Sequence, residues 1–269
     1  MTILDLSHFK DPDHPPMACL TAYTMPMAQA LDGHVDLLLV GDSLGMVLYG
    51  FDTTREVDLD LMIRHGQAVV KGASQSWVIV DMPFGSYEED KDMALNNARK
   101  VMDETGCAGL KLEGGMEMTP IMAHLIEHDI PVIGHVGLMP QKVRGRFRAR
   151  GRDQTESSRI IEDAKAVAGT GVAALVIEAV MEDIAQDITK ALHVPTIGIG
   201  ASPHCDGQIL VTEDMIGMTA GELPKFVKQY GAQGRDISRC AQAYADDVRR
   251  RKFPRSDNIY QREKARKSA

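Results

Sequence analysis

The chain has 269 residues, 44% of them hydrophobic, which is enough for one substantial core and close to the ~250 residues typical of a (β/α)8 barrel. It has no apolar stretch near the ~18 residues that span a membrane, no signal-peptide pattern at its start and no C-x-x-C pair among its four cysteines, so we expect a cytoplasmic protein without a zinc knuckle or disulfide framework. The net charge of −8 and the absence of a nucleic-acid-binding motif argue against a nucleic-acid partner, although residues 142–152 contain six basic residues and no acid.

Short apolar runs alternate with stretches long enough for a helix along the whole chain. The expected strands are 18–23, 37–42, 77–81, 109–113, 131–135, 174–178, 195–200 and 209–211. The expected helices are 27–31, 59–70, 88–105, 120–128, 157–168, 183–192 and 237–250. Eight strand–helix repeats with polar residues at most strand ends favour a closed (β/α)8 barrel of the α/β class over a doubly wound sheet, whose site would lie at one switch point. No glycine-rich nucleotide-binding fingerprint is present.

Nothing in the middle of the chain resembles a linker. We therefore expect one barrel domain with terminal helices, residues 1–252, followed by a flexible tail, residues 253–269. The end of the chain from Arg249 to Lys267 is strongly basic, with nine basic residues against two acids. Such a run is typical of a solvated surface or of a contact with an acidic neighbouring subunit.

Five expected strands end at or near a residue that can bind a metal or transfer a proton: Asp42, Asp81, Glu113, His135 and Glu178. Because the carboxyl ends of all strands in a barrel converge on one mouth, we expect these residues to share a site. Asp42, Asp81 and Glu113 would lie on neighbouring strands and repel one another unless a cation lies among them. Oxygen ligands favour Mg²⁺. Taken singly, Asp42 or Asp81 could instead be a helix N-cap.

Lys111 and Glu113 are two positions apart in a strand, so both side chains point to the same face of the sheet. Inside a barrel, a lysine and a carboxylate must be paired with each other or bound to a charged ligand. A charged ligand would indicate a binding site, whereas pairing alone would make them a structural ion pair. Ser43, beside Asp42, could bind a ligand carboxylate. Glu178, on a more distant strand, suits a general base, and His135 could supply a hydrogen bond or be a satisfied interior histidine. The pattern predicts proton abstraction next to a carbonyl, with a metal-stabilised enolate.

Several motifs resemble those of the ketopantoate hydroxymethyltransferase family, in the same order and with nearly the same spacing. They are Val40–Met46, Asp81–Phe84, Lys111–Gly115, Gly134–Leu138, Asp206–Val211 and Pro224–Val227. The likeness covers about residues 15–235.

The resemblance implies a (β/α)8 barrel of the phosphoenolpyruvate mutase/isocitrate lyase type and a homo-oligomer, typically a decamer. It implies transfer of a hydroxymethyl group from the co-substrate 5,10-methylenetetrahydrofolate to 3-methyl-2-oxobutanoate, giving 2-dehydropantoate for pantothenate synthesis. Asp42 and Asp81 would hold Mg²⁺, with Glu113 close by or linked through water. The remaining implied roles are substrate binding by Ser43 and Lys111, at a site also bordered by Asp42, Asp81 and His135, and removal of the C3 proton by Glu178.

The chain departs from the family in residues 142–152, where an arginine-rich loop replaces a glycine- and tyrosine-containing one. We expect this loop to affect lid closure, and one hypothesis is that it attracts the anionic glutamate tail of folate. A carbon–carbon lyase or mutase of the isocitrate lyase group is the alternative enzyme, although the Lys-Lys-Cys-Gly-His loop of the lyases is absent. The alternative in which the protein is not an enzyme is a non-catalytic paralogue that binds polyanions.

Overall fold

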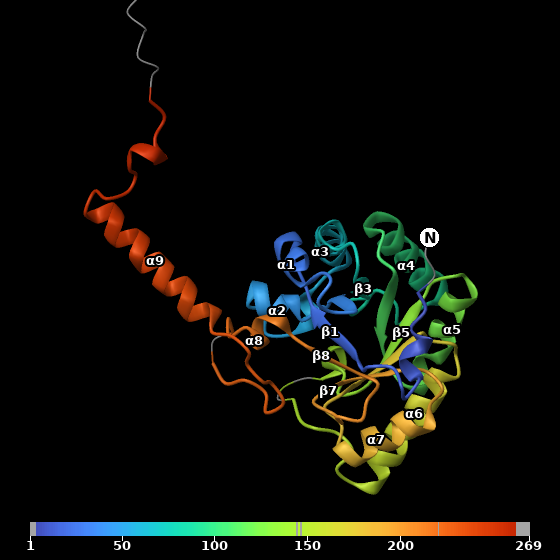
Figure 1. Cartoon of the computed structure of the whole chain (residues 1–269). Helices are drawn as coiled ribbons and strands as arrows, with labels where there is room; N and C mark the ends of the chain where they lie inside the picture. Colours follow the sequence, from blue (N-terminus) through green and yellow to red (C-terminus); the bar gives the residue numbers. More distant parts are fainter. Residues whose placement is uncertain (1–3, 144, 146, 220, 262–269) are drawn as a thin grey trace, which may run out of the picture. The chain divides into compact units, whose positions relative to one another are not determined.

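Eight parallel strands form a closed barrel in the order β1 to β8, and β8 pairs with β1 (Figure 1). The computed structural model describes residues 4–143, 145, 147–219 and 221–261. The strands are β1 (Met17–Thr21), β2 (Leu37–Val40), β3 (Trp77–Asp81), β4 (Gly109–Glu113), β5 (Val132–Gly137), β6 (Ala174–Glu178), β7 (Thr196–Ile199) and β8 (Gly207–Leu210). The predicted barrel is therefore confirmed, and β3, β4 and β6 have the predicted bounds.

Helices follow the strands along the chain. They are α1 (Met25–Leu31), α2 (Leu44–Tyr49), α3 (Leu59–Gly72), α4 (Lys91–Thr105), α5 (Thr119–Glu127), α6 (Gln154–Ala168), α7 (Glu182–Ala191), α8 (Thr212–Met215) and α9 (Gln233–Arg249). Asp58, Asp90 and Asp153 begin α3, α4 and α6, and each carboxylate accepts the N–H three residues along. The predicted start of α4 at Glu88 is wrong, because Asp90 is the cap and the Glu88 carboxylate accepts the N–H of Gly85 instead.

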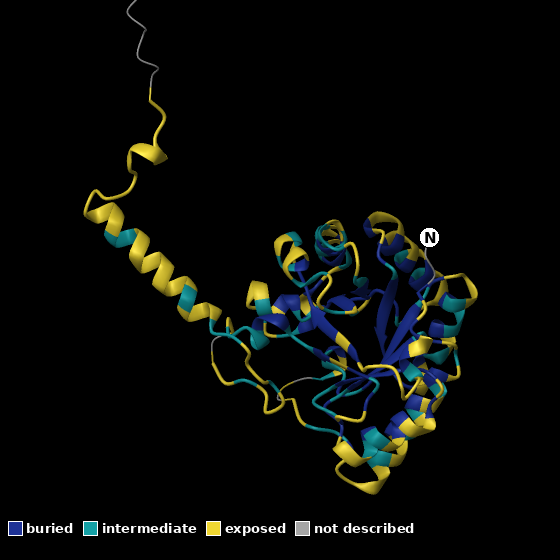
Figure 2. Ribbon diagram, viewed as in Figure 1, coloured by how far each residue is buried: buried dark blue, intermediate teal, exposed yellow. Residues whose placement is uncertain are grey.

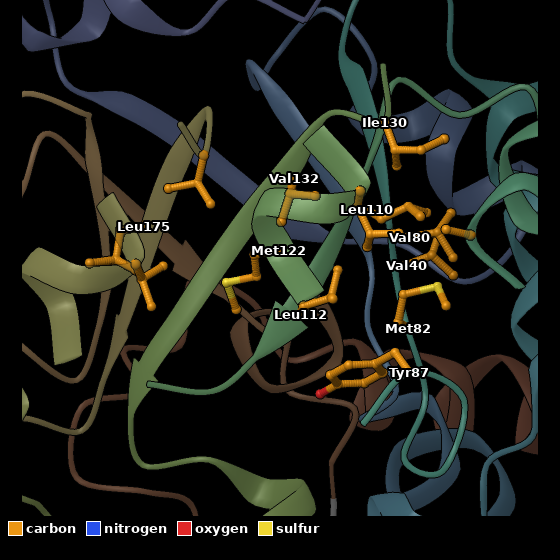
Figure 3. Close-up of a cluster of buried hydrophobic side chains, with 14 of the residues drawn as sticks. Val40, Val80, Met82, Tyr87, Leu110, Leu112, Met122, Ile130, Val132 and Leu175 are labelled. Carbon is orange, nitrogen blue, oxygen red and sulfur yellow. The ribbon is translucent and has the colours of Figure 1, made fainter. Parts of the chain in front are cut away.

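Side chains on the two faces of the strands belong to separate apolar clusters. Leu37 and Leu39 pack inside the barrel, whereas Leu38 and Val40 pack against the surrounding helices. Figure 3 shows part of the outer cluster, including Leu110 and Leu112, and Figure 2 shows that the strands are almost wholly buried. Because neighbouring residues of a strand point to opposite faces, Lys111 and Glu113 share the inner face, as predicted.

The chain divides into two compact units. The first extends to Thr212 and includes Leu223–Val227, and the second consists of Glu213–Glu222 and the chain from Lys228 onward. The predicted boundary between residues 252 and 253 stays a prediction, and residues 262–269 of the predicted tail lie outside the described residues. Within the described part, no helix is both long and apolar enough to cross a membrane.

Candidate active site

The residues predicted from the strand ends come together at the mouth of the barrel. Asp81 lies opposite Lys111 in the β3–β4 pair, and Glu113 lies opposite His135 in the β4–β5 pair. We call the following set the mouth network: Asp42, Asp81, Lys111, Glu113, His135 and Glu178. All are buried except Glu178, whose side chain is 19% exposed. An almost closed polar cluster with one accessible carboxylate is therefore the main chemical feature of the mouth.

Lys111 and His135 connect the acids of the mouth network. The Lys111 Nζ lies 3.1 Å from Asp81 Oδ1 and 3.2 Å from His135 Nδ1. His135 Nε2 lies 3.2 Å from Glu178 Oε2, and His135 Nδ1 lies 3.5 Å from Glu113 Oε1. A single path of close contacts therefore runs from Asp81 to Glu178.

Excess negative charge shifts the pKa values in the mouth network. Burial and the charges of Asp81 and Glu113 raise the pKa of Asp42 well above its ordinary value. Burial also raises the pKa of Asp81, although the Lys111 ammonium opposes that shift. Burial lowers the pKa of Lys111, but the surrounding carboxylates outweigh it and raise the value, so Lys111 stays charged. The acids outnumber this cation, and a further cation among them would be stabilised.

The protonation of His135 depends on opposing influences. Burial and the charge of Lys111 lower the pKa of His135, but the hydrogen bonds to Glu113 and Glu178 outweigh them and raise it to about 9. The histidine can therefore carry or share a proton next to Glu178.

The donor set around Asp42 and Asp81 fits a hard divalent cation. Asp81 Oδ2 accepts the N–H of Asp42 at 3.1 Å, whereas Asp81 Oδ1 is buried, accepts no hydrogen bond of normal geometry and has only the ammonium beside it. Among the described residues, no three His, Cys, Asp or Glu side chains already converge as a complete ligand set. Asp42 and Asp81 remain, and Mg²⁺ in proteins is usually held by one or two carboxylates and keeps several of its own waters.

The N-cap interpretation of Asp42 and Asp81 does not hold in the structure. The N-cap of α2 is Ser43, whose side chain makes no capping hydrogen bond. The Ser43 hydroxyl instead lies 2.9 Å from the Tyr23 hydroxyl. A methyl group in place of the Gly41 hydrogen would lie 3.0 Å from Ser43 Oγ, so a larger residue at position 41 would crowd this hydroxyl. Ser43 is half-buried beside Asp42. Its predicted role in substrate binding stays a prediction.

Sequence reasoning missed Gln141. This side chain is buried and donates a hydrogen bond from Nε2 to Asp42 Oδ2 at 2.8 Å. Its position directly after Pro140, in a connection without periodicity, gave no signal that it would reach a strand end 99 residues away in sequence. The segment after Glu178 was also missed: Ala179 has a φ of +48°, and its carbonyl accepts the N–H of Arg150 at 2.7 Å.

Two surface hollows among the described residues lie outside the mouth network. One of about 900 Å³ lies over α6 and the connection after β4, and one of about 450 Å³ is lined in part by Lys142 and Arg150. Arg150 already lies 3.5 Å from Glu156, and Lys142 pairs with Glu117. Arg144 and Arg146 of the predicted arginine loop lie outside the described residues. The hypothesis that this loop attracts a folate tail therefore stays a prediction.

The raised pKa of Asp42 predicts a pH-dependent stability. The folded protein binds the Asp42 proton more tightly than the unfolded chain does, so this contribution to stability falls as pH rises from 3.8 toward the raised pKa. The Asn side chain stays neutral at both pH 5 and pH 8, so it does not make this pH-dependent contribution. In a chelating buffer at pH 8 we therefore expect Asp42→Asn to melt at a higher temperature than the unaltered protein. Thermal unfolding at pH 5 and pH 8 checks this, and a difference that does not grow with pH would contradict it.

The sequence as a whole matches one protein family. The family model described as "Ketopantoate hydroxymethyltransferase" matches residues 1–256. A protein of Rhizobium etli named 3-methyl-2-oxobutanoate hydroxymethyltransferase is 53% identical over 249 residues, covering 92% of this chain and 91% of that protein. A protein of the same name from Rhodospirillum rubrum is 50% identical over 262 residues, covering 97% of this chain and 94% of its own length.

Solved structures with a similar fold are much more distant in sequence. Phosphoenolpyruvate phosphomutase of Streptomyces platensis subsp. rosaceus superposes with a TM-score of 0.59 at 11% identity, covering 95% of this chain and 91% of that one. Phosphonopyruvate hydrolase, solved in complex with oxalate and Mg²⁺, gives 0.59 at 11% identity, with 94% and 92% covered. At this identity the likeness shows the fold alone. It confirms the predicted barrel type.

Proposed function

The chain belongs to the ketopantoate hydroxymethyltransferase family, and from this we propose that it transfers a hydroxymethyl group to 3-methyl-2-oxobutanoate, giving 2-dehydropantoate. We also propose 5,10-methylenetetrahydrofolate as the donor. The observation that carries the chemistry is the path of contacts from Lys111 through His135 to Glu178, because it joins an anion-binding cation to an accessible base. Neither the lyase or mutase alternative nor the non-catalytic paralogue is supported by the relatives, which are named as hydroxymethyltransferases.

Glu178 is the proposed base. Its partly exposed carboxylate removes the proton from C3 of the oxo acid, and that carbon then forms a bond to the one-carbon unit of the donor. His135 Nε2, 3.2 Å from Glu178 Oε2, would orient the carboxylate. Both C–N bonds of the one-carbon unit break, water supplies the oxygen of the new hydroxyl group, and tetrahydrofolate leaves with one proton from C3 and one from water on its two nitrogens. Glu178 is the most exposed member of the mouth network.

Lys111 and Ser43 are the proposed anchors of the oxo acid. The ammonium of Lys111 would attract the substrate carboxylate, and the half-buried Ser43 hydroxyl would donate a hydrogen bond to it. Asp81 holds the ammonium at 3.1 Å, so it is in place before the substrate arrives. Asp42, Asp81 and His135 border this position.

Asp42 and Asp81 are the proposed holders of Mg²⁺, with Glu113 beside them or linked through water. When bound, Mg²⁺ supplies positive charge that polarises the 2-oxo group and lowers the cost of negative charge on its oxygen. The burial of these carboxylates among further acids, which raises the pKa of Asp42, supports this assignment.

The remaining assignments concern the whole molecule. We propose a cytoplasmic enzyme that uses a branched 2-oxo acid and a folate as substrates and has no nucleic-acid partner. We propose a homo-oligomer, specifically a decamer, and the division into a domain 1–252 and a tail 253–269. The membership of a biosynthetic enzyme family supports the small-molecule substrates and the location.

A direct assay tests the proposed function. The purified protein is incubated with Mg²⁺, 3-methyl-2-oxobutanoate and 5,10-methylenetetrahydrofolate, and 2-dehydropantoate is measured by mass spectrometry. We expect product that requires all three additions. Formation of a cleaved acid from the oxo acid alone would instead indicate a lyase.

A further inference from the structure

Gln141 connects the ends of three neighbouring strands. It lies in the 3-10 helix Pro140–Lys142, after β5, and only 2% of it is exposed. Its Nε2 donates hydrogen bonds to Asp42 Oδ2 at 2.8 Å and to the Met82 carbonyl at 3.0 Å. Its backbone N–H donates to Glu113 Oε2 at 3.1 Å. One residue therefore contacts the carboxylates that follow β2 and end β4, together with the backbone that follows β3.

The orientation of the Gln141 amide is determined by its neighbours. The Met82 carbonyl can only accept a hydrogen bond, so the nitrogen must face it. On the other side, the Tyr87 hydroxyl donates to Gln141 Oε1 at 2.7 Å. Burial raises the pKa of Tyr87 well above its ordinary value, so this hydroxyl keeps its proton. Turning the amide over would place its oxygen against the Met82 carbonyl oxygen, and two acceptors cannot share a hydrogen bond.

Tyr87 is itself fixed at the end of β4. Its hydroxyl accepts the N–H of Glu113 at 3.1 Å, and its ring packs at the edge of the outer apolar cluster (Figure 3). On the other side of Gln141, Arg55 donates to the Gln141 carbonyl at 3.1 Å and lies over the Phe84 ring. Both the side chain and the backbone of Gln141 are therefore restrained.

We propose that Gln141, fixed by Tyr87, is a positioning residue that aims the carboxylates of Asp42 and Glu113 at a bound divalent cation. This inference rests on the metal site proposed above. An N–H donor on one oxygen of a carboxylate sets the direction of the other oxygen, so it decides how well the group can serve as a ligand. Removing such outer partners typically lowers metal affinity 10–100-fold. If the amide instead competed with the metal for Asp42, its removal would tighten binding.

Binding of Mn²⁺ alone, without substrate, tests this proposal. Free Mn²⁺ is followed by electron paramagnetic resonance in titrations of the unaltered protein, Gln141→Leu, Tyr87→Phe and the double variant. Gln67→Leu, an exposed glutamine on α3 that donates to the Glu104 carbonyl, is the matched control. We expect a Kd for Mn²⁺ that is 10–100-fold higher in Gln141→Leu, a smaller rise in Tyr87→Phe and no change in the control.

The double variant separates positioning from general loosening of the fold. Because Tyr87 acts through Gln141, the double variant should bind Mn²⁺ about as weakly as Gln141→Leu alone. With saturating Mg²⁺, the kcat of Gln141→Leu should recover to within a few-fold of the unaltered enzyme. If Gln141→Leu does not fold, Tyr87→Phe still tests the proposal, because it leaves the amide in place and removes the hydroxyl that anchors it, which is also the acceptor of the Glu113 N–H.

Three results would overturn the inference. The first is Mn²⁺ binding that is unchanged or tighter in Gln141→Leu. The second is a loss of Mn²⁺ affinity in the double variant that equals the sum of the losses in the two single variants. Both results leave the proposed metal site itself intact. The third is Mn²⁺ binding that persists in Asp81→Asn, which would remove the proposed metal site and the inference together.

Discussion

Replacing Glu178 with Gln is expected to lower kcat by about 10²–10⁴-fold, the range that a positioned general base contributes. Gln has nearly the same shape, and its amide oxygen can take the place of the carboxylate oxygen that lies 3.2 Å from His135 Nε2, so the fold and Mg²⁺ binding should be retained. What is lost is the ability to take up the C3 proton. Steady-state kinetics with saturating substrates measure the effect.

The matched control is Glu127→Gln, an exposed glutamate at the end of α5. Its kcat should equal that of the unaltered protein. A Glu178→Gln variant that kept its activity within 10-fold would exclude Glu178 as the base and would move attention to His135.

Replacing Lys111 with Met is expected to have two effects of different origin. In a chelating buffer the buried Asp81 loses its cation, and breaking a buried pair in this way costs about 3–5 kcal/mol of stability. With Mg²⁺ present, part of that stability should return. The KM for 3-methyl-2-oxobutanoate should still rise by roughly 10- to 10²-fold, because a charge-assisted contact to the substrate carboxylate is worth about 1.5–3 kcal/mol.

This pair of measurements distinguishes substrate binding from a structural ion pair. A purely structural Lys111 would lower the unfolding free energy without raising KM once Mg²⁺ has restored the fold. Lys100→Met is the control, since Lys100 makes an exposed ion pair with Asp60 at 2.7 Å. An exposed pair of this kind contributes at most about 1 kcal/mol, so neither stability nor KM should change much.

The barrel and its main polar residues could be predicted because each strand carries a local signal. In β4 the alternation of Leu110, Lys111, Leu112 and Glu113 fixes both the period of the strand and the face that each side chain takes. In β3 an apolar run ends at Asp81 and marks the mouth of the barrel directly. Such signals depend only on neighbouring residues, so a single sequence contains them.

The elements that were missed depend on partners far away in sequence. The helix α2 begins immediately after Ser43 and is only six residues long, too short for a recognisable period. Gln141 gains its role from Asp42, Met82 and Tyr87, none of which its own surroundings predict. The start of α4 was misplaced because either of two acidic positions could begin it, and only the turn at Gly85 decides between them.

Exchange of the C3 proton of 3-methyl-2-oxobutanoate in deuterated water is the most direct test of the proposed chemistry. Proton NMR follows the substrate with the enzyme and Mg²⁺, without any folate, so that only proton removal is observed. We expect exchange in the unaltered protein that stops on chelation and is absent in Glu178→Gln. No exchange in the unaltered protein, or undiminished exchange in Glu178→Gln, would contradict the account of Glu178 as the base.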